Sequence, residues 1–361
     1  MPAGGHAAIP ATFGDVTVEW CRARIQDRFD DLLVEVGATG VQDGRFGTTA
    51  RLSLTWVHGQ GPPTMIVKLA SASPRTRQAG RLHRTYEVET GFYQDMARHV
   101  GAHVAHCYFA AYDQDTGGYC LLLEDITGAV QGDQVAGSPP GHVLTALTEL
   151  ARLHASTFGD ERLRVLPWLR GRSPVITSHA AAAMALRWSR RFTTRLADSL
   201  HRDIPQALDL LSASAPAYGG SPSPSPSPSP SPEVGVALVH GDFRSENLLF
   251  RAGHAVVLDW QTAGQGAAMA DVSYFIGTSA ADAGEPARHA RYLDHYLAQL
   301  RAEGAVPDQD ECWRDYRAYA FGGLIMAIVG WMLVDRTPRG DDVFAAMANR
   351  AASHAIQVIR A

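Results

Sequence analysis

The residues with the strongest chemical signature follow two short apolar runs in the second half of the 361-residue chain. Asp242 and Asn247 come directly after the run 236–239 and its His-Gly pair, and Asp259 ends the run 256–258. Each half has the form apolar strand, polar residues, apolar strand, so we expect the three side chains to meet at one mouth between short strands. Two carboxylates and a carboxamide supply the oxygen ligands that a hard divalent cation such as Mg²⁺ prefers.

The spacing of these residues is itself informative. His-Gly-Asp is followed after four residues by Asn247, and Asp259 stands 12 positions beyond that asparagine. This order matches the catalytic layout of kinase-fold phosphotransferases. Polar residues can also serve only to close loops, but the spacing, the order and the flanking strands all favour the catalytic interpretation.

Lys68 is the second unusual feature. Of the 32 basic residues, 31 are arginines, and the single lysine lies in an apolar, strand-like run at 65–70. A lysine ammonium is a compact point charge, whereas a guanidinium is a wide planar fork. Composition bias would explain the number of lysines, but a site into which guanidinium does not fit would explain the position as well.

Together these motifs resemble those of the aminoglycoside phosphotransferase-like and choline/ecdysteroid kinase-like (CHK-like) small-molecule kinases. The resemblance rests on HGDFRSENLLF at 240–250 and VVLDWQTAGQGAAMADVSYFIG at 256–277, and it extends over most of the chain from about Leu32. It implies an α+β, bilobal protein-kinase-like fold with a small sheet-rich N-lobe and a larger, mainly helical C-lobe.

The resemblance also implies roles for individual residues. Asp242 would accept the proton of the attacking hydroxyl or orient it, and Asn247 and Asp259 would hold Mg²⁺ between the phosphates of ATP. Asp271 is expected to support the catalytic loop through hydrogen bonds, and His240 to be structural.

Lys68 would bind the α- and β-phosphates of ATP and pair with a helix glutamate. We prefer Glu89, which has the family's E-x-x-F-Y spacing, over Glu87, which points to a different helix face. The Gly-rich segment 40–49 departs from G-x-G-x-x-G, and any hairpin can contain two glycines; adenine would meet the backbone that follows the last strand of this lobe. The cofactor-binding candidates are Lys68, Glu89, Gly44, Phe46, Gly47, Thr48, Glu124 and Ile126.

The hydrophobic pattern predicts a change of architecture near residue 125. We expect an N-terminal ATP-binding lobe at 1–125 and a C-terminal catalytic and acceptor-binding lobe at 126–361, with a solvated Ser-Pro repeat inserted at 221–232. The apolar run 318–334 is expected to be a buried helix rather than a membrane span. Strands are predicted at 32–36, 51–57, 64–70, 103–112 and 119–124, and helices at 85–100, 143–158, 180–199, 287–300 and 310–334.

Bulk composition narrows the class of protein further. A formal charge of -5 gives no support for binding to nucleic acid. The four cysteines form no C-x-x-C pair, so neither a zinc knuckle nor a disulfide framework is indicated. We see no secretory signal at the N-terminus, and expect a cytoplasmic protein whose partner is a hydroxylated small molecule.

The acceptor is less well defined. Segment 160–203 holds nine arginines against four acidic residues, an unfavourable wall for a polycationic aminoglycoside. The arginines could instead form a solvated face, and acidic residues between 282 and 315 could restore a negative wall. We expect a neutral or weakly charged acceptor: an antibiotic, a sugar-like compound or another natural-product metabolite.

Two other functions stay open. A kinase of Ser/Thr in a peptide precursor is one, although no Ala-Pro-Glu stop follows Asp259. A catalytically inactive binding protein that keeps the fold is the other, although Lys68, Asp242 and Asp259, one or more of which inactive relatives usually lack, are all present.

Overall fold

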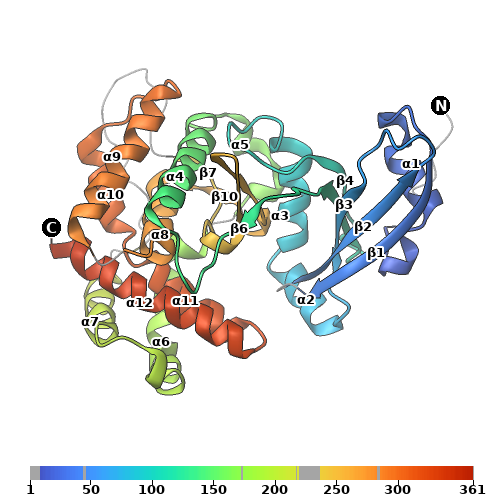
Figure 1. Cartoon of the computed structure of the whole chain (residues 1–361). Coiled ribbons are helices and arrows are strands. Elements are labelled where there is room, and N and C mark those ends of the chain that lie inside the picture. The colour runs from blue at the N-terminus through green and yellow to red at the C-terminus, as the bar shows by residue number, and fades with distance from the viewer. Residues whose placement is uncertain are drawn as a thin grey trace. The chain divides into compact units, whose positions relative to one another are not determined.

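The computed structural model describes residues 9–43, 46–171, 174–216, 218, 236–282 and 285–360. The Ser-Pro repeat at 221–232 and the candidate Gly44 lie outside the described residues. The chain divides into two compact units, one of Met1–Arg98 with Val104–Thr127 and the other of His99–His103 with Gly128–Ala361. The first unit holds the largest sheet and the second most of the helices (Figure 1).

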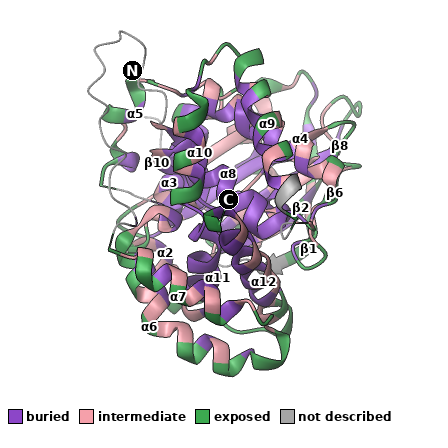
Figure 2. Ribbon diagram, turned by 90° about the vertical axis from the view of Figure 1, so that its left-hand side faces the viewer, coloured by how far each residue is buried: buried purple, intermediate pink, exposed green. Residues whose placement is uncertain are grey.

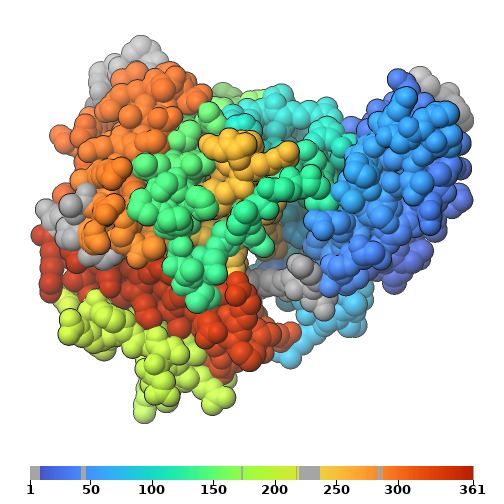
Figure 3. Space-filling view, viewed as in Figure 1, coloured from blue at the N-terminus to red at the C-terminus, as the bar shows by residue number. Residues whose placement is uncertain are grey.

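The N-terminal unit is built on a five-stranded antiparallel sheet of order β1-β2-β3-β5-β4. Buried and less buried residues alternate along β2 and β3, so one face of the sheet packs into the core and the other stays accessible. Residues of β1 and β2 form part of this unit's surface (Figure 3). The strands are β1 (Leu33–Asp43), β2 (Gly47–Trp56), β3 (Thr64–Ala70), β4 (Cys107–Tyr112) and β5 (Tyr119–Glu124).

Three helices complete this unit. Helix α1 (Val18–Ile25) begins where Thr17 caps the backbone N–H of Trp20, and it packs on the core face of the sheet. The sequence interpretation did not include α2 (Pro74–Leu82), which Ser73 caps. The helix expected over 85–100 is shorter: α3 (Thr85–Gly91) continues as a π-helical turn to Met96.

The C-terminal unit is mainly helical. Helices α8 and α11 form its interior, and every residue of α8 is buried (Figure 2). The helices are α4 (Pro140–Ala155), α5 (Arg162–Val165), α6 (His179–Arg195), α7 (Ile204–Ser214), α8 (Ala268–Ser279), α9 (Pro286–Ala302), α10 (Gln309–Ala318), α11 (Gly322–Leu333) and α12 (Pro338–Arg360).

Two small antiparallel sheets carry the loops of this unit. Strand β7 (Val236–Val239) pairs with β10 (Gly264–Ala267), and β8 (Leu248–Arg251) pairs with both β6 (Val130–Gln131) and β9 (His254–Val257). The short strands expected on either side of the polar residues are therefore present.

The single helix expected over 310–334 is wrong, because the segment forms two helices that are separated at 319–321. The run 309–333 is apolar and long enough to cross a membrane, but 78% of its most apolar window is buried inside the protein. Gly323 explains the close packing: a Cβ at this position would lie 2.5 Å from the Thr278 side chain and 2.9 Å from Ala351. The expectation of a buried helix is confirmed for α11.

The four cysteines are all free. Burial raises the pKa of the Cys21 thiol to about 11 and that of Cys107 to about 12. Because the thiolate is the reactive form, these thiols are poor nucleophiles near neutral pH.

A buried histidine makes the stability of the fold depend on pH. Burial, and next the neighbouring His289, hold the pKa of His354 well below its ordinary value of 6.5. The unfolded chain therefore takes up a proton below pH 6.5 that the folded chain excludes, and the folded state loses stability as the pH falls. Lowering the pH from 6.5 to 5.5 should cost about 1 kcal/mol from this residue. Urea unfolding of the wild-type protein and His354→Gln at both pH values measures the effect; equal pH slopes would contradict it.

Candidate active site

In the N-terminal unit, the lone lysine forms a buried ion pair. The ammonium of Lys68 on β3 donates to both carboxylate oxygens of Glu89, each at 2.8 Å, and the hydroxyl of Tyr119 also donates to Glu89. The Glu89 side chain is 3% exposed and that of Lys68 is 18% exposed. Glu87 instead pairs with Arg84. Glu89 is thus the partner of Lys68, as its spacing predicted, whereas phosphate binding by this pair stays a prediction.

The Gly-rich turn before β2 is fixed to β3. Ser71 donates its backbone N–H to the carbonyl of Phe46 at 3.1 Å, and Tyr86 donates its hydroxyl to the same oxygen. A Cβ at Gly47 would lie 2.7 Å from the carbonyl oxygen of Leu69, so this close approach requires glycine.

The two threonines that follow face opposite sides of the sheet. Thr48 is in register with Leu69 and is buried, whereas Thr49 is in register with Lys68. Cα partners in an antiparallel pair present their side chains to the same face. Thr49, which the motif search did not select, therefore shares a face with Lys68, and Thr48 does not.

The end of β5 is the other candidate binding segment. The backbone N–H of Glu124 donates to the carbonyl of His106, the residue before β4, at 2.8 Å. Its carboxylate accepts the N–H of His106 at 3.3 Å, and Ile126 follows in irregular backbone. The side chain of Glu124 is thus engaged locally, which leaves a role for this segment to its backbone.

In the C-terminal unit, α8 binds the loop that follows β7 through hydrogen bonds. The carboxylate of Asp271 accepts the backbone N–H of His240 at 2.6 Å and that of Gly241 at 2.9 Å. Gly241 has φ 77°, and a Cβ there would lie 2.5 Å from the carbonyl oxygen of Thr262. The expected support of this loop by Asp271 is confirmed.

Asp242 projects from this loop and is bound through both of its carboxylate oxygens. The hydroxyl of Tyr274 donates to Oδ1 at 2.6 Å, and Nε of Arg244 donates to Oδ2 at 3.3 Å. The carboxamide of Asn247 donates to the backbone carbonyl of Asp242 at 2.8 Å. Asp242 and Asn247 are therefore brought together, and their geometry depends on two residues that the sequence analysis missed, Tyr274 and Arg244.

A signal for Tyr274 exists in the sequence. It lies three residues after Asp271 on the same helix, so both side chains leave α8 on one face. Arg244 lies two residues from Asp242 and from Glu246 in the sequence, but this spacing alone does not show that the loop turns its guanidinium toward both carboxylates. Burial opposes its charge, but Asp242, Tyr274 and Glu246 raise the pKa of Arg244 above its ordinary value.

Asp259 lies at the end of β9 in the left-handed region, with φ 65°. Its Oδ2 accepts the carboxamide of Gln261 at 2.8 Å. The ring of His240 reaches the carbonyl of the preceding residue, Leu258, at 2.9 Å, and Thr262 bonds the His240 carbonyl. These contacts tie the Asp259 turn to the His240 loop.

Part of the arginine-rich segment reaches the catalytic loop. Cβ atoms added at Gly241 and Gly264 would lie 3.4 Å and 3.1 Å from the ring of Pro174, so this proline covers both. The arginines of α6 are exposed, as a solvated face would be; Arg172 lies outside the described residues. The exposed α6 arginines are Arg187, Arg190, Arg191 and Arg195.

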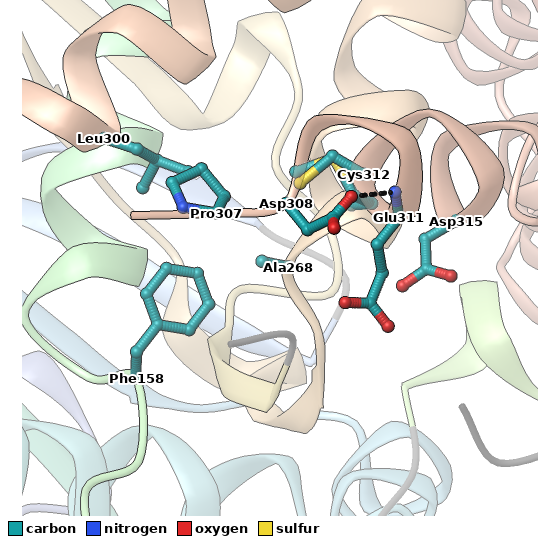
Figure 4. Close-up of a pocket in the computed structure, with 9 residues that line it drawn as sticks. Phe158, Ala268, Leu300, Pro307, Asp308, Glu311, Cys312 and Asp315 are labelled. Carbon is teal, nitrogen blue, oxygen red and sulfur yellow. Dashed lines mark hydrogen bonds between the residues drawn. The ribbon is translucent and has the colours of Figure 1, made fainter. Parts of the chain in front are cut away.

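Three of the acidic residues that could restore a negative wall line a pocket elsewhere in this unit. Asp308, which caps α10, and Glu311 and Asp315 within it stand around this pocket with Phe158 and Ala268 (Figure 4). Ala268 follows the pairing of Ala267 with Val236, at the opposite end of β7 from the catalytic loop. These carboxylates therefore do not lie beside Asp242.

Comparison with known families assigns the chain. Residues 50–315 match the sequence profile of the phosphotransferase enzyme family. The match spans well over half of the chain, which therefore belongs to this family and is a phosphotransferase. No curated protein sequence matches the chain.

Several solved structures share the fold. A Ralstonia eutropha JMP134 protein assigned as an aminoglycoside phosphotransferase has a TM-score of 0.54 at 18% identity, covering 95% of this chain and 97% of that one. Choline kinase from Cryptosporidium parvum Iowa II has a TM-score of 0.55 at 12% identity, covering 95% and 94%. Amicoumacin kinase in complex with AMP-PNP and Ca²⁺ has a TM-score of 0.51 at 14% identity, covering 91% and 95%. The expected α+β kinase-like fold is confirmed.

Tyr274→Phe should slow phosphotransfer with little change in the KM for nucleotide. It removes one hydrogen bond to a charged group, typically about 1.5–3 kcal/mol, and so should lower kcat by about tenfold or more. Tyr292→Phe is a matched control, because the Tyr292 hydroxyl also donates to a carboxylate, that of Asp282, outside the catalytic loop. Steady-state kinetics of both variants, with thermal unfolding alongside, tests the assignment; equal kcat values for the two would refute it.

Proposed function

We propose that this phosphotransferase moves the γ-phosphate of ATP, in the presence of Mg²⁺, to a hydroxyl group of a small molecule. Asp242 orients that hydroxyl and accepts its proton, Lys68 binds the α- and β-phosphates, and Asn247 and Asp259 bind the metal. The N-terminal unit then serves nucleotide binding, and the C-terminal unit serves catalysis and acceptor binding.

The observation that carries this proposal is the pairing of Lys68 with Glu89. A two-point bond to a carboxylate that is 3% exposed fixes the ammonium in one place. A fixed point charge beside a Gly-rich turn is what the phosphates of a nucleotide require in kinase-fold enzymes. Because apolar side chains of similar size often stabilise a fold as well as a buried ion pair does, stability alone does not explain this pair.

The donor set of the C-terminal unit fits a magnesium ion. The amide nitrogen of Asn247 donates to the carbonyl of Asp242, so the amide oxygen is the atom that would bind the metal. Asp259 adds carboxylate oxygens, and Mg²⁺ commonly takes one or two carboxylates together with substrate phosphates. When bound, the metal would neutralise charge that develops on the phosphates.

Asp242 positions the acceptor hydroxyl and takes its proton. Its carboxylate holds the acceptor hydroxyl in line with the γ-phosphorus; the hydroxyl oxygen bonds to phosphorus while the bond to the β–γ bridging oxygen breaks and ADP leaves. The hydroxyl proton passes to Asp242. The bonds from Tyr274 and Arg244 hold the direction of this carboxylate, so little reorganisation is needed at the moment of transfer.

The charges around this loop favour a neutral or weakly charged acceptor. Glu246, the nearest further carboxylate on the loop, is already bonded to Arg244 at 2.6 Å and to Arg339 at 2.9 Å. A polycationic aminoglycoside would have to compete with these guanidinium groups for its ammonium contacts.

Two variants test the reaction itself. Asp242→Asn should lower phosphotransfer at least a hundredfold while leaving ATP binding close to wild type, because only the proton acceptor is lost. Lys68→Arg should lose most activity through weaker nucleotide binding, because a guanidinium is wider than the site of one ammonium. ADP release in the presence of acceptor, with calorimetric ATP binding, measures both. Full activity in either variant would overturn the corresponding role.

The acceptor class has its own test. We expect neutral polyhydroxylated compounds to be phosphorylated with at least tenfold higher kcat/KM than kanamycin-type polycations, because the loop carboxylates are already paired with arginine. A panel of neutral sugars, macrolides and aminoglycosides assayed with γ-labelled ATP measures this ratio. The reverse preference would show that the pairing of these carboxylates with arginine does not determine the class of acceptor.

A further inference from the structure

A two-point ion pair on the accessible face of the N-terminal sheet has no assigned role. Nε of Arg51 donates to Oδ2 of Asp125 at 2.7 Å, and Nη2 donates to Oδ1 at 3.2 Å. The Asp125 side chain is 5% exposed, whereas that of Arg51 is 56% exposed. A fork of two parallel bonds fixes the plane of a guanidinium, so Arg51 presents a flat, oriented and open surface.

The strand register shows which face Arg51 occupies. Arg51 is paired with Ile66, and Thr49 is paired with Lys68. Because partners share a face and alternate residues point the same way, all four side chains lie on one side of the sheet. The intervening residues Ala50 and Val67 are buried on the other side, in the core.

The two ends of this face differ. Beyond Lys68 the sheet ends at the pairing of Gly47 with Ala70, where the turn at Phe46 is bonded to β3. In the other direction, Ile66 lies two residues before Lys68, about 6.6 Å away along β3, and Arg51 lies beside Ile66 on β2. A nucleotide whose phosphates lie at Lys68 and the Gly-rich turn can extend its ribose and base along this face toward Ile66 and Arg51.

We propose that Arg51, held flat by Asp125, is the platform against which the nucleobase lies, with Ile66 as the adjoining apolar contact. This inference rests on the proposed ATP-dependent function and names a base-binding residue that no sequence motif indicated. A guanidinium stacks on aromatic rings through its planar face, which an ammonium cannot do. The larger ring system of a purine covers this platform better than a pyrimidine.

Calorimetric titration of the full chain separates stacking from charge. With Mg²⁺ present, Arg51→Ala should weaken ATP binding about tenfold, in line with the loss of one stacking contact to the base. Arg51→Lys should weaken it to a similar extent, because lysine keeps the charge but not the plane. Binding of inorganic tripolyphosphate should be unchanged in both variants, since it has no base. Asp125→Asn should weaken ATP binding about threefold by loosening the platform.

Arg84→Ala is the matched control, since Arg84 also forms a two-point pair, with Glu87, in the same unit; its ATP affinity should equal that of the wild type. Equal losses for ATP and tripolyphosphate in Arg51→Ala, or full affinity in Arg51→Lys, would show that Arg51 acts as a charge and would overturn the inference alone. Failure of the wild-type protein to bind ATP would overturn the proposed function with it.

Discussion

Asp271 is the residue on which the geometry of the catalytic loop depends. A fully buried carboxylate is tolerated only when hydrogen bonds compensate its charge, and here the backbone N–H groups of His240 and Gly241 supply them. The backbone N–H groups of His240 and Gly241 are buried as well, so they in turn need the carboxylate of Asp271 as an acceptor. Since Asp271 belongs to the buried helix α8, the loop takes its position from the core, and Tyr274, one turn later on that helix, extends the same control to the carboxylate of Asp242.

The N-terminal unit applies the same principle to a cation. Glu89 is buried beside the phenol of Tyr119, and Lys68 is the group that neutralises it. An ammonium that would otherwise sample many rotamers is thereby held in one position before any ligand arrives. Preorganisation of this kind lowers the cost of binding an anion, because the entropy of fixing the side chain is already lost in folding. In each unit a buried carboxylate therefore positions the group that we assign to chemistry.

Sequence reasoning succeeded where the information is local. The bounds of β3 and the choice of Glu89 over Glu87 both follow from periodicity or short spacing. It failed where distant segments decide. Arg244 acts through Asp242 and Glu246 in a loop shaped by α8, and the break between α10 and α11 accompanies close packing of Gly323 against Thr278 and Ala351. Gly323 lies far in the sequence from both of its contacts, and although Arg244 is only two residues from Asp242 and from Glu246, α8 sets the backbone of the loop that brings them together, so pattern and propensity reveal neither.

The unusual use of arginine and lysine now has a physical explanation. Arg51, Arg84 and Arg244 each bind carboxylates with two nitrogens of the guanidinium, which uses its fixed fork of donors. Lys68 also binds a carboxylate, but both oxygens converge on one nitrogen, so the remaining side of the ammonium is a single compact charge. A guanidinium in that place would direct its donors along the plane of the fork and would take up more space beside Glu89 than an ammonium does. At these four sites the residue type therefore follows the geometry of the contact: arginine where two nitrogens bind carboxylates, and lysine where both oxygens of one carboxylate converge on one nitrogen.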